Sequence, residues 1–60
     1  MSYKDVESKL ASFGWKRKRQ RGSHIILSKQ GKIVPLPRRK DIPKGTIASI
    51  ERLTGVSLTP

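Results

Sequence analysis

The chain has 60 residues, of which 14 are Lys or Arg and 4 are Asp or Glu, for a formal charge of +10. A chain of this length forms one domain at most, so we expect a single domain over residues 1–60. It has no cysteine, and one histidine with four carboxylates offers few ligands for a tight zinc site. Its longest apolar run, Ile25-Ile26-Leu27, is far too short to cross a bilayer. These counts exclude large-cofactor enzymes, membrane proteins and disulfide-rich domains, and we expect a soluble, cytoplasmic protein that needs no metal or cofactor.

The excess positive charge favours a polyanionic partner. Nucleic acids release condensed counterions when Lys and Arg neutralise their phosphates, and this release drives binding. An anionic membrane surface and an acidic protein are alternatives that composition leaves open. We rank nucleic acid first among the three.

Residues 2–13 are predicted to form an amphipathic helix. Four apolar residues recur there at the helical spacings of three and four: Tyr3, Val6, Leu10 and Phe13. Ser2 can cap the first turn. Gly14 is expected to end the helix by taking the left-handed conformation.

Three strands are predicted next, joined by turns at residues 22–23 and 29–32: 15–21, 24–28 and 33–36. The first is so rich in Lys and Arg that neither of its faces can be buried, so we place it at a sheet edge. In the third, Pro35 lacks a backbone N–H for the ladder, and we expect a bulge or the end of the strand there. Such short connections imply antiparallel hairpins.

A second amphipathic helix is predicted to begin near Pro43 or Thr46 and to end at Thr54, before Gly55. Both helices should pack on one face of the sheet, giving a small α+β domain of order α-β-β-β-α whose other sheet face stays open. The predicted core comprises Tyr3, Val6, Leu10, Phe13, Trp15, Ile25, Leu27, Val34, Ile42, Ile47, Ile50 and Leu53, with Val56 and Leu58 folding back on it. Strand alternation then puts His24 and Ile26 on the open face.

Four short motifs, in this order, resemble the HicA-type toxins: Gly14-Trp15, Gly22-Ser23-His24, Val34-Pro35 and Lys44-Gly45-Thr46. Those toxins are small ribonucleases of toxin–antitoxin pairs, folded like a double-stranded-RNA-binding domain, and the resemblance covers residues 3–55. It implies that His24 is catalytic, that mRNA is the substrate, and that a HicB-type antitoxin binds over the site. Many relatives carry a second histidine just after the proline of the third strand, where this chain has Leu36 and Pro37.

His24 suits RNA cleavage without a metal. RNA carries its own nucleophile, the 2′-hydroxyl, and a neutral imidazole can take its proton near neutral pH. Cations such as Arg21 and Lys16 should disfavour the imidazolium and so keep His24 able to accept that proton. Basic side chains can also hold the nonbridging phosphate oxygens, where charge develops. The products would be a 2′,3′-cyclic phosphate and a 5′-hydroxyl, and no residue is assigned as the acid for the leaving oxygen.

The predicted RNA-binding residues surround the first hairpin: Lys16, Arg17, Lys18, Arg19, Arg21, Gly22 and Ser23. Alternation along a strand lets only about half of the cations face one ligand. For the second basic cluster, Arg38-Arg39-Lys40, RNA contact and plain solvation are equally open. Trp15 could stack on a base, but its place just after a helix end favours the core.

Simpler interpretations stay open for the individual residues. His24 can be an ordinary surface histidine, and Gly22 an ordinary hairpin glycine rather than a point where RNA approaches the backbone. Ser23 either belongs to the turn or orients the imidazole. At the level of the whole chain, the alternatives are a noncatalytic RNA-binding module and a basic protein whose charge only pairs with an acidic partner.

Overall fold

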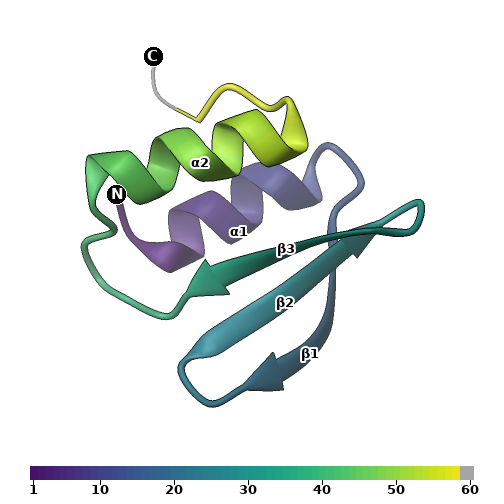
Figure 1. Cartoon of the computed structure of the whole chain (residues 1–60), viewed down its shortest axis with the longest axis horizontal. Helices are drawn as coiled ribbons and strands as arrows, with labels where there is room; N and C mark the ends of the chain where they lie inside the picture. The colour runs from purple at the N-terminus through teal and green to yellow at the C-terminus, as the bar shows by residue number, and fades with distance from the viewer. Residues whose placement is uncertain (59–60) are drawn as a thin grey trace.

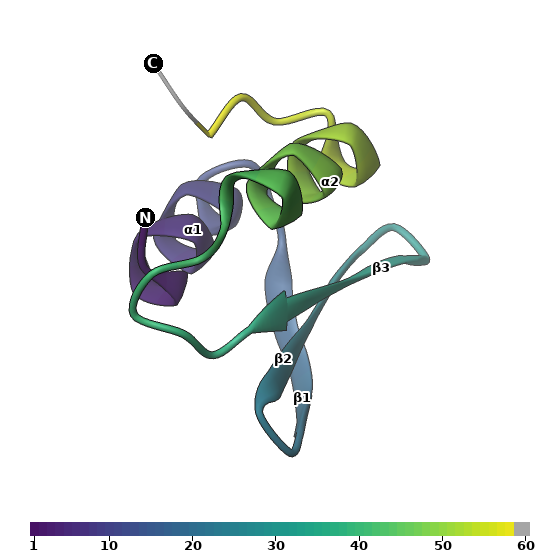
Figure 2. The same cartoon turned by 60° about the vertical axis from the view of Figure 1, so that its left-hand side comes forward.

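The computed structural model describes residues 1–58 and has the predicted order of helix, three strands and helix (Figure 1). The elements are α1 (Tyr3–Ala11), β1 (Lys16–Arg21), β2 (His24–Lys29), β3 (Lys32–Pro37) and α2 (Lys44–Thr54). The strands form one antiparallel sheet in the order β1-β2-β3, so β1 is an edge strand as predicted. Both helices lie on the same side of the sheet, which Figure 2 shows from a second direction. The α+β fold class is therefore confirmed.

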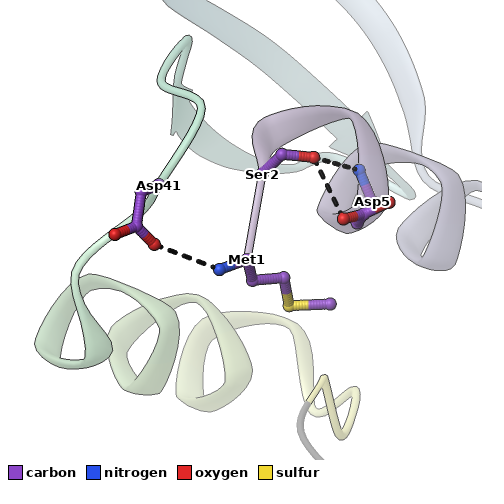
Figure 3. Close-up of polar contacts among 4 residues, drawn as sticks. All are labelled: Met1, Ser2, Asp5 and Asp41. Atoms are coloured by element: carbon purple, nitrogen blue, oxygen red, sulfur yellow. Dashed lines mark hydrogen bonds and ion pairs between the residues drawn. The ribbon is translucent and has the colours of Figure 1, made fainter.

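The first helix begins at the predicted cap. The Ser2 hydroxyl oxygen accepts a hydrogen bond from the Asp5 backbone N–H at 3.3 Å and donates one to the Asp5 carboxylate at 3.0 Å (Figure 3). Gly14 has a φ of +95°, the left-handed conformation predicted for the helix exit. Phe13 is 54% exposed, so its assignment to the core is wrong. Because α1 ends at Ala11, the helical spacing no longer governs where the Phe13 side chain lies.

The segment before α1 is joined to the connection between β3 and α2. The Met1 ammonium group lies 3.3 Å from the Asp41 carboxylate (Figure 3), and the Ile42 backbone N–H donates to the Met1 carbonyl at 2.8 Å. The Tyr3 backbone N–H donates to the Arg39 carbonyl at 3.0 Å. These bonds fix the start of α1 beside the segment that follows β3.

The sheet has one irregularity, and it lies in β1. Between Arg17 and Arg19 the pairing with β2 shifts, which leaves Lys18 unpaired in a β-bulge. The pairing of β2 with β3 runs without a shift to Pro37, so the bulge or strand end predicted at Pro35 is wrong. Pro35 lies opposite Ile26 in an edge strand, where one side of the backbone needs no ladder hydrogen bond.

The core lies between the sheet and the two helices and consists of Val6, Leu10, Trp15, Ile25, Leu27, Val34, Leu36, Ile42, Ile47, Ile50, Val56 and Leu58. Tyr3 is partly buried against it. The inward orientation of Ile25 and Leu27 is as predicted, so His24 and Ile26 belong to the opposite face of β2.

Two leucines differ from the prediction. Leu36 is fully buried although it was not assigned to the core; it shares the inward parity of Val34, because β3 continues past Pro35. Leu53, assigned to the core by its helical spacing, is 57% exposed. Val56 and Leu58 are buried after α2, as predicted, and complete the core in its place.

Candidate nucleic-acid interface

His24 is the first residue of the central strand, and its side chain is exposed. Its register partners are Arg21 on β1 and Pro37 on β3. The imidazole forms no hydrogen bond or ion pair with any other side chain of residues 1–58. Both ring nitrogens are therefore available to an external ligand.

The sheet surface that carries His24 is the one turned away from the helices, and we call it the open face. Residues paired across neighbouring strands share a face. The open face therefore carries Lys16, Arg19 and Arg21 of β1, His24, Ile26 and Ser28 of β2, and Ile33, Pro35 and Pro37 of β3. Its β1 edge is basic, whereas its β3 edge is apolar.

The three open-face cations lie at different distances from the histidine. Arg21 is directly opposite His24. Lys16 is opposite Ser28, four positions further along β2, which corresponds to about 13 Å of strand. Of the two cations expected beside the imidazole, the structure therefore places Arg21 there and Lys16 at the other end of the sheet.

Arg17 is directed to the opposite side of the sheet, where α1 lies. It pairs with the inward-facing Leu27, and its Nε and Nη2 donate to the two carboxylate oxygens of Glu7 at 3.0 and 2.8 Å. This hydrogen bonding, together with the negative charge of Glu7, raises the pKa of Arg17 above its ordinary value. The bulge causes this arrangement: in a regular strand Arg17 would share a face with Arg19, but the extra residue Lys18 reverses the parity.

The turn between β1 and β2 has two residues, as predicted. Gly22 has a φ of +56°, and a Cβ there would meet nothing within 4 Å, so the turn needs glycine for its backbone conformation and not for space. The Ser23 carbonyl accepts a hydrogen bond from the Arg38 backbone N–H at 2.7 Å. The Ser23 hydroxyl forms no hydrogen bond to His24. Of the two roles considered for Ser23, the structure therefore favours membership of the turn.

A depression of about 440 Å³ lies beside this turn, and we call it the turn depression. Its lining residues are Tyr3, Gly22, Ser23, Arg38 and Lys40. The Arg38 guanidinium carbon lies 5.7 Å from the centre of the Tyr3 ring, within the range of a cation–π contact. Arg39 is exposed but does not line the depression. The three cations of this cluster cannot be told apart in the sequence, because the chain turns directly after β3, where the Arg39 backbone N–H donates to the Pro37 carbonyl at 2.9 Å.

Other features of residues 1–58 are less suited to a polyanion. Trp15 is only 3% exposed, which confirms the core position and removes its ring from base stacking. A hollow of about 480 Å³ near the start of α2 carries both signs of charge and is lined by Met1, Asp41, Ile42, Lys44, Ile47 and Glu51. In this range no group of three or more acidic or histidine side chains is placed to hold a metal ion, and no helix is long and apolar enough to cross a membrane.

Comparison with known protein families gives a match. A family model described as the HicA toxin of bacterial toxin–antitoxin systems matches residues 3–56. Neither the curated proteins nor the solved structures give a significant match. The matched range includes all five elements and the hairpin that carries His24. The chain therefore belongs to the HicA toxin family, the toxins of toxin–antitoxin pairs, which implies an antitoxin as its partner.

Proposed function

We propose that this toxin is a metal-independent endoribonuclease that cleaves mRNA, with His24 as the base that takes the proton of the 2′-hydroxyl. The observation that carries the proposal is an exposed imidazole, without an internal partner, directly opposite Arg21 on a basic sheet face. Family membership supports the toxin role, and the side chains of the open face are of the types that RNA cleavage without a metal requires.

The reaction needs no group beyond those on the open face and water. A neutral imidazole nitrogen of His24 accepts the 2′-hydroxyl proton, and the 2′-oxygen forms a bond to the adjacent phosphorus. The bond from phosphorus to the 5′-oxygen breaks, leaving a 2′,3′-cyclic phosphate, and the departing oxygen takes a proton from water. The hydroxide left by that water takes the proton from the His24 imidazolium, which restores the neutral base. Arg21, and Arg19 beyond it on the same face, hold the nonbridging oxygens as their charge develops.

The same face is the expected binding surface for the antitoxin, which we propose to be of the HicB type. Ile33 is 51% exposed on its β3 edge, close to Pro35, whereas the β1 edge presents guanidinium and ammonium groups. A partner with apolar side chains beside carboxylates would complement both edges. Binding there would cover His24 and so prevent cleavage.

A noncatalytic RNA-binding module is the second candidate. One observation favours it: the residue of β3 opposite His24 is Pro37 and not a second histidine, so the open face offers one imidazole only. Such a module would bind RNA through the same cations and leave the strand intact. The two candidates differ in whether replacing His24 changes cleavage.

The test compares the parent protein with His24→Ala on a single-stranded RNA, with a metal chelator present. General base catalysis typically contributes about 100-fold or more, so we expect at least that loss of cleavage rate and an RNA affinity within about twofold of the parent. Thermal unfolding serves as the control for folding, because the exposed imidazole contributes nothing to the core. Unchanged cleavage by His24→Ala contradicts the proposal, and binding without cleavage by the parent favours the noncatalytic module. Weak binding that does not change with salt would exclude RNA as the main ligand.

A further inference from the structure

We propose that the turn depression is a second phosphate subsite, which binds the RNA phosphodiester next to the one that is cleaved. The inference rests on the proposed ribonuclease function and extends it to a part of the chain outside the open face. Its ligand is a phosphate of the RNA strand, held by Arg38 and Lys40 against the Tyr3 ring.

The lining of the turn depression is chemically suited to an anion. Two of its five lining residues, Arg38 and Lys40, are cations, and none is a carboxylate. Its volume of about 440 Å³ falls within the usual range for ligand-binding clefts. The Tyr3 ring adds an apolar wall against which a ribose or a base can pack.

Arg38 is held in place before any ligand binds. Its backbone N–H donates to the Ser23 carbonyl at 2.7 Å, and its guanidinium lies against the Tyr3 ring. The Tyr3 backbone is in turn bonded to the Arg39 carbonyl at 3.0 Å. The Arg38 side chain makes no ion pair with a carboxylate of residues 1–58, so its N–H groups remain available for phosphate oxygens. The Tyr3 contact restrains the exposed Arg38 side chain, which reduces the conformational entropy that it loses on binding.

The turn depression is adjacent to His24 in the pairing of β2 with β3. Ser23 directly precedes His24, and Arg38 directly follows Pro37, the partner of His24. The Ser23–Arg38 hydrogen bond is therefore the next rung of the ladder beyond the histidine, at the end of the sheet. An RNA strand that leaves the open face over this end, with its cleaved phosphate at His24, brings a neighbouring phosphate to Arg38.

Arg39 provides a matched control. It lies between the two proposed ligands, carries the same charge and is exposed, yet it does not line the depression. A general attraction between RNA and this basic segment would depend on all three cations about equally. If the depression is a subsite, RNA binding depends on Arg38 and Lys40 and does not change when Arg39 is replaced.

The experiment has a binding part and a cleavage part. In a His24→Ala background, which keeps the RNA intact, the affinity for a single-stranded oligoribonucleotide is measured against salt for Arg38→Ala, Lys40→Ala and Arg39→Ala. Loss of one phosphate contact should reduce the slope of log affinity against log salt by about 0.7, and we expect this for Arg38→Ala and Lys40→Ala only. With His24 intact, kcat/KM is measured for oligoribonucleotides that differ by one phosphate beside the cleaved bond. The added phosphate should raise kcat/KM about tenfold in the parent and in Arg39→Ala, the gain expected from one hydrogen bond to a charged group, and should give no gain in Arg38→Ala.

The possible results distinguish a failure of the subsite proposal from a failure of the proposed ribonuclease function. Equal losses from all three replacements, or a gain from the added phosphate that survives Arg38→Ala, would overturn the subsite while cleavage stands. Absence of RNA binding and cleavage in the parent would overturn the proposed function and the subsite together. Lys40→Ala, which replaces an exposed side chain, keeps the test valid if Arg38→Ala does not fold.

Discussion

Arg21 and His24 are register partners at the closed end of the β1–β2 hairpin, joined only by the turn of Gly22 and Ser23. A two-residue hairpin fixes the strand register, so the guanidinium and the imidazole are held on one face of the sheet. In the proposed mechanism, Arg21 binds the phosphate whose neighbouring 2′-hydroxyl meets His24. The arginine that binds the phosphate and the histidine that acts as general base thus lie within four consecutive residues of the chain.

The cations of β1 should contribute unequally to RNA binding. Arg19→Ala and Arg21→Ala should each weaken binding and reduce the salt slope by about 0.7, because both residues lie on the open face. Arg17→Ala should have a much smaller effect, since Arg17 is paired with Glu7 on the helix side. Binding measured against salt in the His24→Ala background tests this order.

Glu7→Gln tests in the opposite direction whether the ion pair with Glu7 keeps Arg17 from RNA. It releases Arg17 and removes one negative charge, so we expect tighter RNA binding than in the parent. Equal losses from the three arginine variants, or weaker RNA binding by Glu7→Gln, would contradict the inference that the bulge directs Arg17 away from the open face.

Two leucines provide a matched pair for stability. Leu36 is fully buried in β3, whereas Leu53 is 57% exposed on α2. Leu36→Ala should lower the free energy of unfolding by about 2–5 kcal/mol because it leaves a cavity in the core. Leu53→Ala should lower it by no more than about 0.5 kcal/mol. Urea denaturation measures both, and similar losses would contradict the observed core.

No side chain is assigned as the general acid for the departing 5′-oxygen, and position 37 allows this assignment to be tested. Pro37 is the β3 partner of His24, so Pro37→His would place a second imidazole beside the first on the open face. A positioned acid for the departing 5′-oxygen should raise the single-turnover cleavage rate by about tenfold or more. Leu36→His is the control: it puts an imidazole in the core, where an unpaired polar group costs about 1–3 kcal/mol, and it should lower stability without raising the rate. A folded Pro37→His protein with an unchanged rate would contradict this placement.

The sequence was sufficient to predict the order of the elements. Gly14 and Gly22 have positive φ angles that few other residues adopt, and the alternation around Ile25 sets which face of β2 is buried. Phe13 and Leu53 were misplaced because helical spacing says which residues share a stripe, but not where the helix ends or which segment covers it. The bulge was not predicted because β1 contains only polar and charged residues, so it has no apolar alternation that could reveal a shift.

The candidate site was predictable only in part. His24 and the basic strand are visible in the sequence, but the pairing of Arg17 with Glu7 depends on how β1 lies against α1. The turn depression requires three segments to meet, from Tyr3 through the hairpin turn to Arg38. Contacts between such distant parts of the chain follow from packing, and local sequence patterns do not contain them.

The most direct test of His24 as the base uses two RNA oligonucleotides that differ only in the 2′-hydroxyl at the cleaved bond. The parent protein should cleave the ribose form and release a 2′,3′-cyclic phosphate and a 5′-hydroxyl, and it should leave the 2′-deoxy form intact at that bond. His24→Ala should cleave neither. Cleavage of the 2′-deoxy form at the same bond, or cleavage of the ribose form by His24→Ala at the parent rate, would contradict the account.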